Sequence, residues 1–134
     1  MPTCLKGTII VFFGCLVMKP HVLILEDDFL MAANLEEVVQ DDLRADPIGV
    51  STIKEALAII PDGIEFAVLD IEVRDGKSYQ VARRLKECDI PFVFLSGTDR
   101  GSIPADLTDV PFLSKPIATG RVVRLARALS SAFH

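Results

Sequence analysis

The stretch HVLILEDD, residues 21–28, decides the fold of this chain. Val22 to Leu25 are apolar without interruption, which is typical of a parallel strand that is covered on both faces of a sheet. Three carboxylates follow at once, in Glu26, Asp27 and Asp28, and each raises the free-energy cost of ionising its neighbours. This crowding of negative charge indicates that a cation binds where the strand ends, with Asp28 the best suited to cap the next helix.

Four further apolar runs follow along the chain, separated by segments of helical periodicity. We expect strands within residues 47–53, 65–71, 91–97 and 110–116. We expect helices around residues 31–39, 54–60, 81–88 and 122–133. Thr52 and Glu55 form the pattern TxxE, which predicts a capping box at the second helix. Strands that alternate with helices predict an open, mostly parallel α/β sheet with helices on both faces.

The segment from Ser96 to Val110 departs from this alternation. Gly97, Gly101 and Pro104 interrupt it, so we expect a fourth helix that is short or irregular, a loop or a single turn. The closing helix is regular by contrast. Its apolar stripe consists of Val122, Leu125, Ala126, Leu129 and Phe133.

The N-terminal segment is the least typical part of the sequence. Residues 8–18, TIIVFFGCLVM, form an apolar run of 11, which is shorter than the about 20 residues that span a membrane. No small-x-small cleavage site follows it. We interpret residues 1–19 as an apolar extension, with Met18 as the natural start, and residues 20–134 as one folded domain. An extension this apolar is expected to be covered by the domain or by another chain.

Composition limits the classes of function. The chain has 134 residues, a formal net charge of -5 and a pI near 4.9, which predicts one domain and no direct contact with nucleic acid. Its three cysteines, Cys4, Cys15 and Cys88, are odd in number and lack CxxC spacing. This pattern favours reduced thiols and a cytoplasmic location.

The residues that carry chemistry stand at the ends of the expected strands. Glu26 and Asp27 end the first strand, Asp70 the third, Ser96 the fourth and Lys115 the fifth. Ligands of open parallel sheets bind beyond the carboxyl ends of the strands, so we expect these side chains to meet. Their carboxylates suit Mg²⁺, with Mn²⁺ as an alternative. This set predicts phosphoryl transfer, with a carboxylate as nucleophile, a hydroxyl donor and a lysine.

Four segments in this order carry a family resemblance: LILEDD, FAVLDIEVRDG, FVFLSG and FLSKP. Together they resemble a bacterial two-component response-regulator receiver domain of the CheY-like type, over about residues 21–133. The resemblance implies a flavodoxin-like fold, with five parallel strands in the order 2-1-3-4-5.

The resemblance also implies a phosphorylation site and its metal. Asp70 would accept a phosphoryl group from a sensor histidine kinase or a histidine phosphotransfer protein. The implied Mg²⁺ ligands are the carboxylates of Glu26, Asp27 and Asp70 and the backbone carbonyl of Glu72. The remaining implied roles are a switch hydroxyl for Ser96, an aromatic switch for Phe112 and phosphoryl pairing for Lys115. The peptide between Lys115 and Pro116 is expected to be cis.

The sequence departs from the family in two places. The loop after Asp70, IEVRDGKS, lacks the usual proline and is shorter, with Asp75 and Gly76 supplying its turn. Phe112 replaces the usual tyrosine of the switch.

We expect a receiver that stands alone, acts through an unidentified protein partner or as a phosphate sink, and is not an enzyme. Two alternatives remain open. One is a small phosphohydrolase of the haloacid-dehalogenase type, in which a nucleophilic aspartate is followed two residues later by another acid, as in Asp70 and Glu72. That class carries its nucleophile on the first strand. The other is a pseudo-receiver that only docks, which the presence of Asp70, Ser96 and Lys115 disfavours. The sequence does not predict the oligomeric state.

Overall fold

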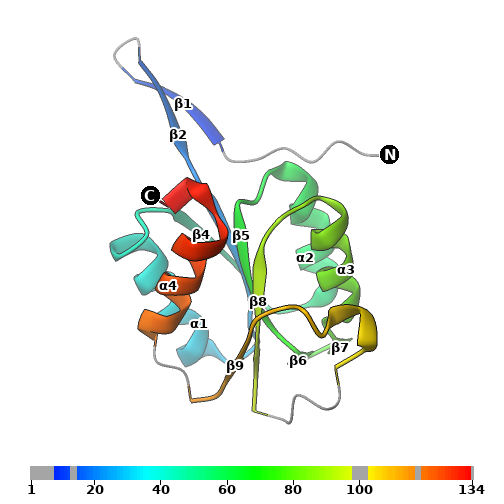
Figure 1. The fold of residues 1–134 in the computed structure, drawn as a ribbon. Coiled ribbons are helices and arrows are strands. Elements are labelled where there is room, and N and C mark those ends of the chain that lie inside the picture. Colours follow the sequence, from blue (N-terminus) through cyan, green and yellow to red (C-terminus); the bar gives the residue numbers. More distant parts are fainter. Residues whose placement is uncertain (1–7, 13–14, 98–102, 117–118, 134) are drawn as a thin grey trace.

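A parallel sheet of five strands forms the centre of the molecule (Figure 1). The computed structural model describes residues 8–12, 15–97, 103–116 and 119–133, with the backbone alone for residues 8–12 and 15–18. In sheet order, the strands are β4 (Asp46–Val50), β3 (His21–Leu25), β5 (Phe66–Asp70), β8 (Phe92–Ser96) and β9 (Phe112–Ser114). All four pairings are parallel. Counted along the domain, this is the predicted order 2-1-3-4-5.

Helices cover both faces of this sheet, as predicted. Figure 1 shows α1 (Phe29–Asp41) and α4 (Thr119–Leu129) on one side, and α2 (Ile53–Ile59) and α3 (Tyr79–Glu87) on the other. Two apolar cores result, one on each face. Successive residues of β3 point into opposite cores, which is why its apolar run is continuous.

Short 3-10 turns complete the helical layers. They are η1 (Ile60–Asp62), η3 (Ala105–Leu107) and η4 (Ser131–Phe133). The turn η3 lies in the segment 96–110, for which we expected a short or irregular fourth helix. Residues 98–102 of that segment lie outside the described residues. Leu107 in η3 is fully buried. The described part therefore confirms the predicted irregularity.

The apolar stripe predicted for the closing helix is wrong at one position. Leu129 is 42% exposed, whereas Val122, Val123 and Ala126 are buried. The regular helix ends at Leu129, and the chain turns into η4, so the side chains no longer follow one helical stripe. Phe133 packs edge-on against Phe66, with 6.2 Å between the ring centroids.

The N-terminal segment forms an antiparallel hairpin that extends away from the sheet (Figure 1). Its strands are β1 (Thr8–Phe12) and β2 (Cys15–Lys19), and Pro20 separates β2 from β3. Because the side chains of residues 8–12 and 15–18 are not described, the covering of this extension and the domain limits stay predictions. Among the described residues, no helix has the length and apolar character needed to cross a membrane.

Cys88 corrects one expectation from the sequence. It is 7% exposed and disulfide-bonded, so the prediction of reduced thiols is wrong for this residue.

Candidate phosphoryl and metal site

The predicted site residues gather where the carboxyl ends of the central strands meet. Glu26 directly follows β3, Asp70 ends β5 and Ser96 ends β8, and these three are 3%, 5% and 2% exposed. Asp27 is exposed at the mouth of the same region. Lys115 directly follows β9 and is partly buried. Parallel strands therefore bring together residues that are far apart in the sequence.

Asp28 is the cap of α1, as predicted. Its Oδ1 accepts hydrogen bonds from the backbone N–H groups of Leu30 and Met31, at 3.0 and 3.1 Å. The backbone N–H of Asp28 donates in turn to Oε1 of Glu26, at 3.0 Å. This local arrangement separates the acidic run into two roles. The side chain of Asp28 caps α1, whereas the side chains of Glu26 and Asp27 remain available to the site.

Lys115 supplies a positive charge inside the cluster. Its Nζ lies 3.0 Å from Oε2 of Glu26 and 3.0 Å from Oδ2 of Asp70, and the contact with Asp70 is also a hydrogen bond. The backbone N–H of Lys115 donates to the carbonyl of Ser96 at 2.9 Å. The peptide between Lys115 and Pro116 is cis, as the resemblance implies.

The cluster perturbs the ionisation of its members. Burial raises the pKa of Glu26, and the negative charge of Asp70 raises it further, although the N–H of Asp28 and the ammonium of Lys115 oppose both. Burial alone would lower the pKa of Lys115. Its hydrogen bond to Asp70 and its ion pair with Glu26 outweigh that effect, so the pKa of Lys115 is raised and the ammonium is held charged.

The three carboxylates fit a divalent ion. One oxygen from each of Glu26, Asp27 and Asp70 lies within 4.8 Å of the others. Hard oxygen donors with an open side toward water match Mg²⁺, which binds few protein groups and keeps several waters. The donor set therefore agrees with the predicted metal.

The loop after Asp70 is a small hairpin of β6 (Glu72–Val73) and β7 (Gly76–Lys77). The side chain of Glu72 pairs with Lys77. The N–H of Ser78 donates to the carbonyl of Ile71, which makes Glu72 and Lys77 a non-hydrogen-bonded pair of the ladder. The carbonyl of Glu72 is therefore not used by the hairpin, which suits the predicted ligand role.

Phe112 is half-buried on β9, where it packs against the core on the α2 and α3 side. Sequence analysis assigned Asp75 only to a turn. In the structure, its carboxylate accepts from the first turn of α2, at the N–H groups of Ile53 and Lys54. The pattern DG indicated the turn, but no sequence signal indicated a partner 22 positions away.

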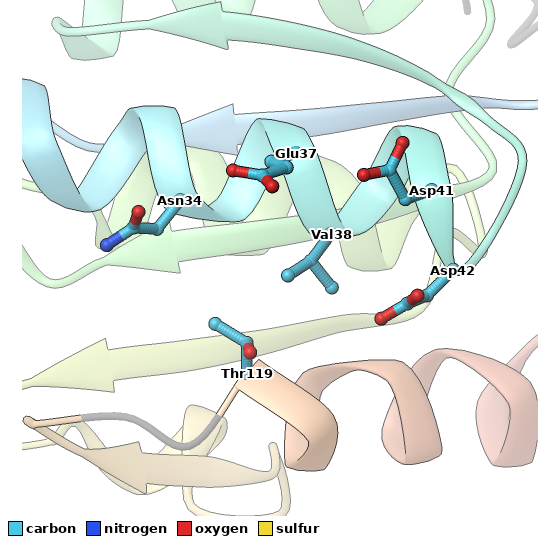
Figure 2. Close-up of a pocket in the computed structure, with 6 residues that line it drawn as sticks. All are labelled: Asn34, Glu37, Val38, Asp41, Asp42 and Thr119. Atoms are coloured by element: carbon cyan, nitrogen blue, oxygen red, sulfur yellow. The ribbon is translucent and has the colours of Figure 1, made fainter.

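Two pockets flank α1. One, of about 330 Å³, includes Glu26, Asp27 and Arg74 and opens on the carboxylate cluster. The other, of about 390 Å³, lies between α1 and the start of α4 and is lined by Glu37, Asp41 and other residues drawn in Figure 2. It contains none of the predicted site residues. The first pocket has two of the predicted metal ligands, Glu26 and Asp27, in its lining.

Comparisons with known proteins found similar solved structures. No protein-family model matches the chain, and neither does any curated protein. Two solved structures of SdrG are similar. The one from Sphingomonas melonis Fr1 is 38% identical, with a TM-score of 0.70, over 83% of this chain and 96% of that one. The BeF3-activated conformation from Pseudomonas melonis Fr1 is 40% identical, with a TM-score of 0.66, over 81% and 94%.

Two further structures are named as receivers. The non-phosphorylated HemR receiver domain from Leptospira biflexa is 26% identical, with a TM-score of 0.70, over 83% of this chain and 94% of that one. A response regulator receiver protein from Sinorhizobium medicae WSM419 shares the fold at 23% identity, with a TM-score of 0.72, over 87% and 98%. With the strand order and the carboxylate cluster, these likenesses show that the chain belongs to the CheY-like response-regulator receiver family.

Proposed function

We propose that this receiver is a phosphorylation switch in which Asp70 accepts a phosphoryl group from a histidine kinase or a histidine phosphotransfer protein, in a Mg²⁺-dependent reaction. The observation that carries the proposal is the position of Lys115, whose Nζ lies 3.0 Å from both Asp70 and Glu26 beside a third carboxylate. A carboxylate nucleophile, a fixed ammonium and metal ligands are the parts that phosphoryl transfer needs.

Each side chain has a separate task in this proposal. Glu26, Asp27, Asp70 and the carbonyl of Glu72 would hold the ion, which would neutralise charge on the phosphoryl oxygens. An oxygen of Asp70 attacks phosphorus, and the bond from phosphorus to the imidazole nitrogen of the donor breaks. We assign the attack to Oδ1, because Oδ2 is engaged by Lys115. Lys115 then pairs with the new phosphoryl group.

In this proposal, phosphorylation changes the structure at the ends of β8 and β9. A phosphoryl group adds negative charge close to Lys115, whose backbone is bonded to that of Ser96. We propose that Ser96 and Phe112 change position in response and that a partner protein binds the changed surface. The BeF3-activated conformation of SdrG supports, by analogy, a change of conformation on phosphorylation, because BeF3 mimics a phosphoryl group.

The position of Asp70 in the sheet favours the phosphorylation switch over the phosphohydrolase alternative. It ends β5, the third strand of the domain and the central strand of the sheet, not the first strand. Mn²⁺ as a substitute ion, the phosphate-sink role and the absence of turnover stay predictions. The cytoplasmic location also stays a prediction, and the disulfide at Cys88 removes the cysteine pattern as its support.

The test is phosphorylation by a small donor. We expect acetyl phosphate with Mg²⁺ to add the mass of one phosphoryl group to the protein, as measured by intact-mass spectrometry. Asp70→Asn should remain unlabelled, and a chelator should prevent labelling of the wild type. Asp41→Asn, a change at an exposed position on α1, is the control and should label normally. Full labelling of Asp70→Asn would refute the assignment.

A further inference from the structure

The hairpin that follows Asp70 is anchored at its base. The N–H of Ile71 donates to the carbonyl of Leu95 on β8 at 3.0 Å, and the carbonyl of Ile71 accepts from Ser78 at 2.8 Å. Ile71 is fully buried, and Ser78 is too. The chain therefore leaves and rejoins the domain at fixed points, with β6 and β7 between them.

The tip of the same hairpin is anchored to a different element. Oδ1 of Asp75 accepts from the backbone N–H of Ile53 at 2.8 Å, and Oδ2 accepts from that of Lys54 at 3.3 Å. These are the first two residues of α2, whose N–H groups have no partner within the helix. These hydrogen bonds lower the pKa of Asp75, so its carboxylate stays charged at neutral pH.

Two side chains share the capping of α2. Thr52 is the residue next to the helix, and its Oγ1 accepts from the N–H of Glu55 at 3.2 Å. Asp75 serves the two N–H groups that Thr52 does not serve. The capping box predicted from Thr52 and Glu55 forms in part, because the Glu55 carboxylate accepts from the Thr52 hydroxyl, and a residue from the hairpin supplies the rest of the cap. A local cap alone would stabilise α2, but this one also ties the hairpin to it.

Packing supports the same attachment. Val73 of β6 is 8% exposed and belongs to the core under α2 and α3. Gly76 has a φ of 135°, a backbone conformation that favours glycine, and a Cβ placed there would lie 3.7 Å from Cδ1 of Ile53. The hairpin tip therefore lies against the start of α2.

We propose that Asp75 is a positioning residue for the metal site, which holds the Glu72 carbonyl in place by tying the hairpin tip to α2. The inference rests on the proposed function, because the ligand role of that carbonyl comes from it. Glu72 stands between the two anchors, and its carbonyl is not used by the ladder. Without Asp75, the carbonyl would sample more positions, and each binding event would have to order it again.

The experiment compares Asp75→Ala and Asp75→Asn with the wild type in the full chain. Mg²⁺ affinity is measured by titrating MgCl2 into metal-free protein and following backbone amide NMR shifts. Amide hydrogen exchange of Ile53 and Lys54 is measured without metal. We expect Asp75→Ala to weaken Mg²⁺ binding about tenfold, as for other groups that orient metal ligands, and to speed both exchange rates. Asp75→Asn keeps one acceptor oxygen and should lie between.

Asp62→Ala is the matched control. Asp62 is an exposed aspartate beside the other end of α2, so its change alters net charge equally without touching the hairpin. We expect its Mg²⁺ affinity to match the wild type.

The outcomes separate the two proposals. Faster exchange at Ile53 and Lys54 with unchanged Mg²⁺ affinity would reduce Asp75 to a helix cap and overturn this inference alone. If Asp75→Ala does not fold, the same comparison is made with Asp75→Asn, for which wild-type Mg²⁺ affinity together with faster exchange at Ile53 and Lys54 has the same meaning. A wild-type protein that shows no Mg²⁺-dependent shift at all would overturn the proposed function itself.

Discussion

The Lys115 cluster and the ion pairs that join α3 to η3 contain the same kinds of group at nearly the same distances. Lys115 lies 3.0 Å from Glu26 and from Asp70. Arg83 of α3 donates two hydrogen bonds to Asp106 of η3, at 2.8 and 3.2 Å. The first cluster is buried at the strand ends, whereas both members of the second pair are about half exposed.

The two carboxylates respond in opposite directions. Burial raises the pKa of Glu26, despite the neighbouring lysine. The hydrogen bonds from Arg83 lower the pKa of Asp106, because desolvation there is too weak to oppose them. Distance to a cation therefore does not decide the effect of a carboxylate on stability. The buried cluster therefore loses stability by holding charges that the proposed chemistry needs, whereas the exposed pair does not.

Removing Lys115 should give the largest effect. Lys115→Met leaves Glu26 and Asp70 buried without their cation, and we expect a loss of about 2 kcal/mol in the metal-free free energy of unfolding. This is below the loss for fully buried pairs because the Lys115 side chain is 24% exposed. Urea denaturation with and without Mg²⁺ measures it, and Mg²⁺ should stabilise the variant more than the wild type.

Lys86→Met is the matched control for Lys115→Met. Lys86 lies 2.7 Å from Asp109, a shorter distance than any in the buried cluster, but both side chains are exposed. Its removal should change stability far less. Equal losses for the two variants would contradict the importance of burial.

Glu26→Gln should give the next largest effect, and its size depends on pH. A raised carboxylate pKa in the folded state means that the stability of the wild type falls as pH rises above the unfolded value of 4.5. The fall levels off above the folded pKa. We therefore expect metal-free Glu26→Gln to gain stability relative to the wild type as pH rises through this window, and to lose Mg²⁺ affinity. Thermal unfolding across the pH range measures it. A difference that does not vary with pH would contradict it.

The predicted fold was read from features that persist through the chain. The apolar run of β3 and the carboxylates after it indicated both a buried strand and a site at its end. The site could be predicted because parallel strands end at one edge of the sheet. This rule places Asp70, Ser96 and Lys115 together even when no contact between them is known. The run of carboxylates also indicated a cation at this edge. The ammonium group of Lys115 supplies part of that positive charge from within the chain.

Three features were missed because local periodicity and spacing do not record them. In the sequence, Asp75 is recognisable only as a turn residue, because its hydrogen bond to the start of α2 forms only in the fold. Cys88 forms a disulfide that no spacing indicated. Leu129 continues the helical stripe in the sequence, but the helix ends there. The first depends on where α2 lies relative to the hairpin, and the last on where α4 ends.

The smallest effect is expected at the exposed pair. Asp106→Asn removes a carboxylate whose pKa is lowered by Arg83, so its contribution to stability exists above the unfolded value of 3.8 and is lost as pH falls through the lower folded pKa. Because the pair is exposed, we expect the melting temperature to fall by no more than about 2 °C at neutral pH. Calorimetry in low and high salt measures it, and salt should erase the difference by screening the pair. A loss as large as that of Lys115→Met, or one that persists in high salt, would show that these surface contacts fix η3 to α3 more strongly than their exposure implies.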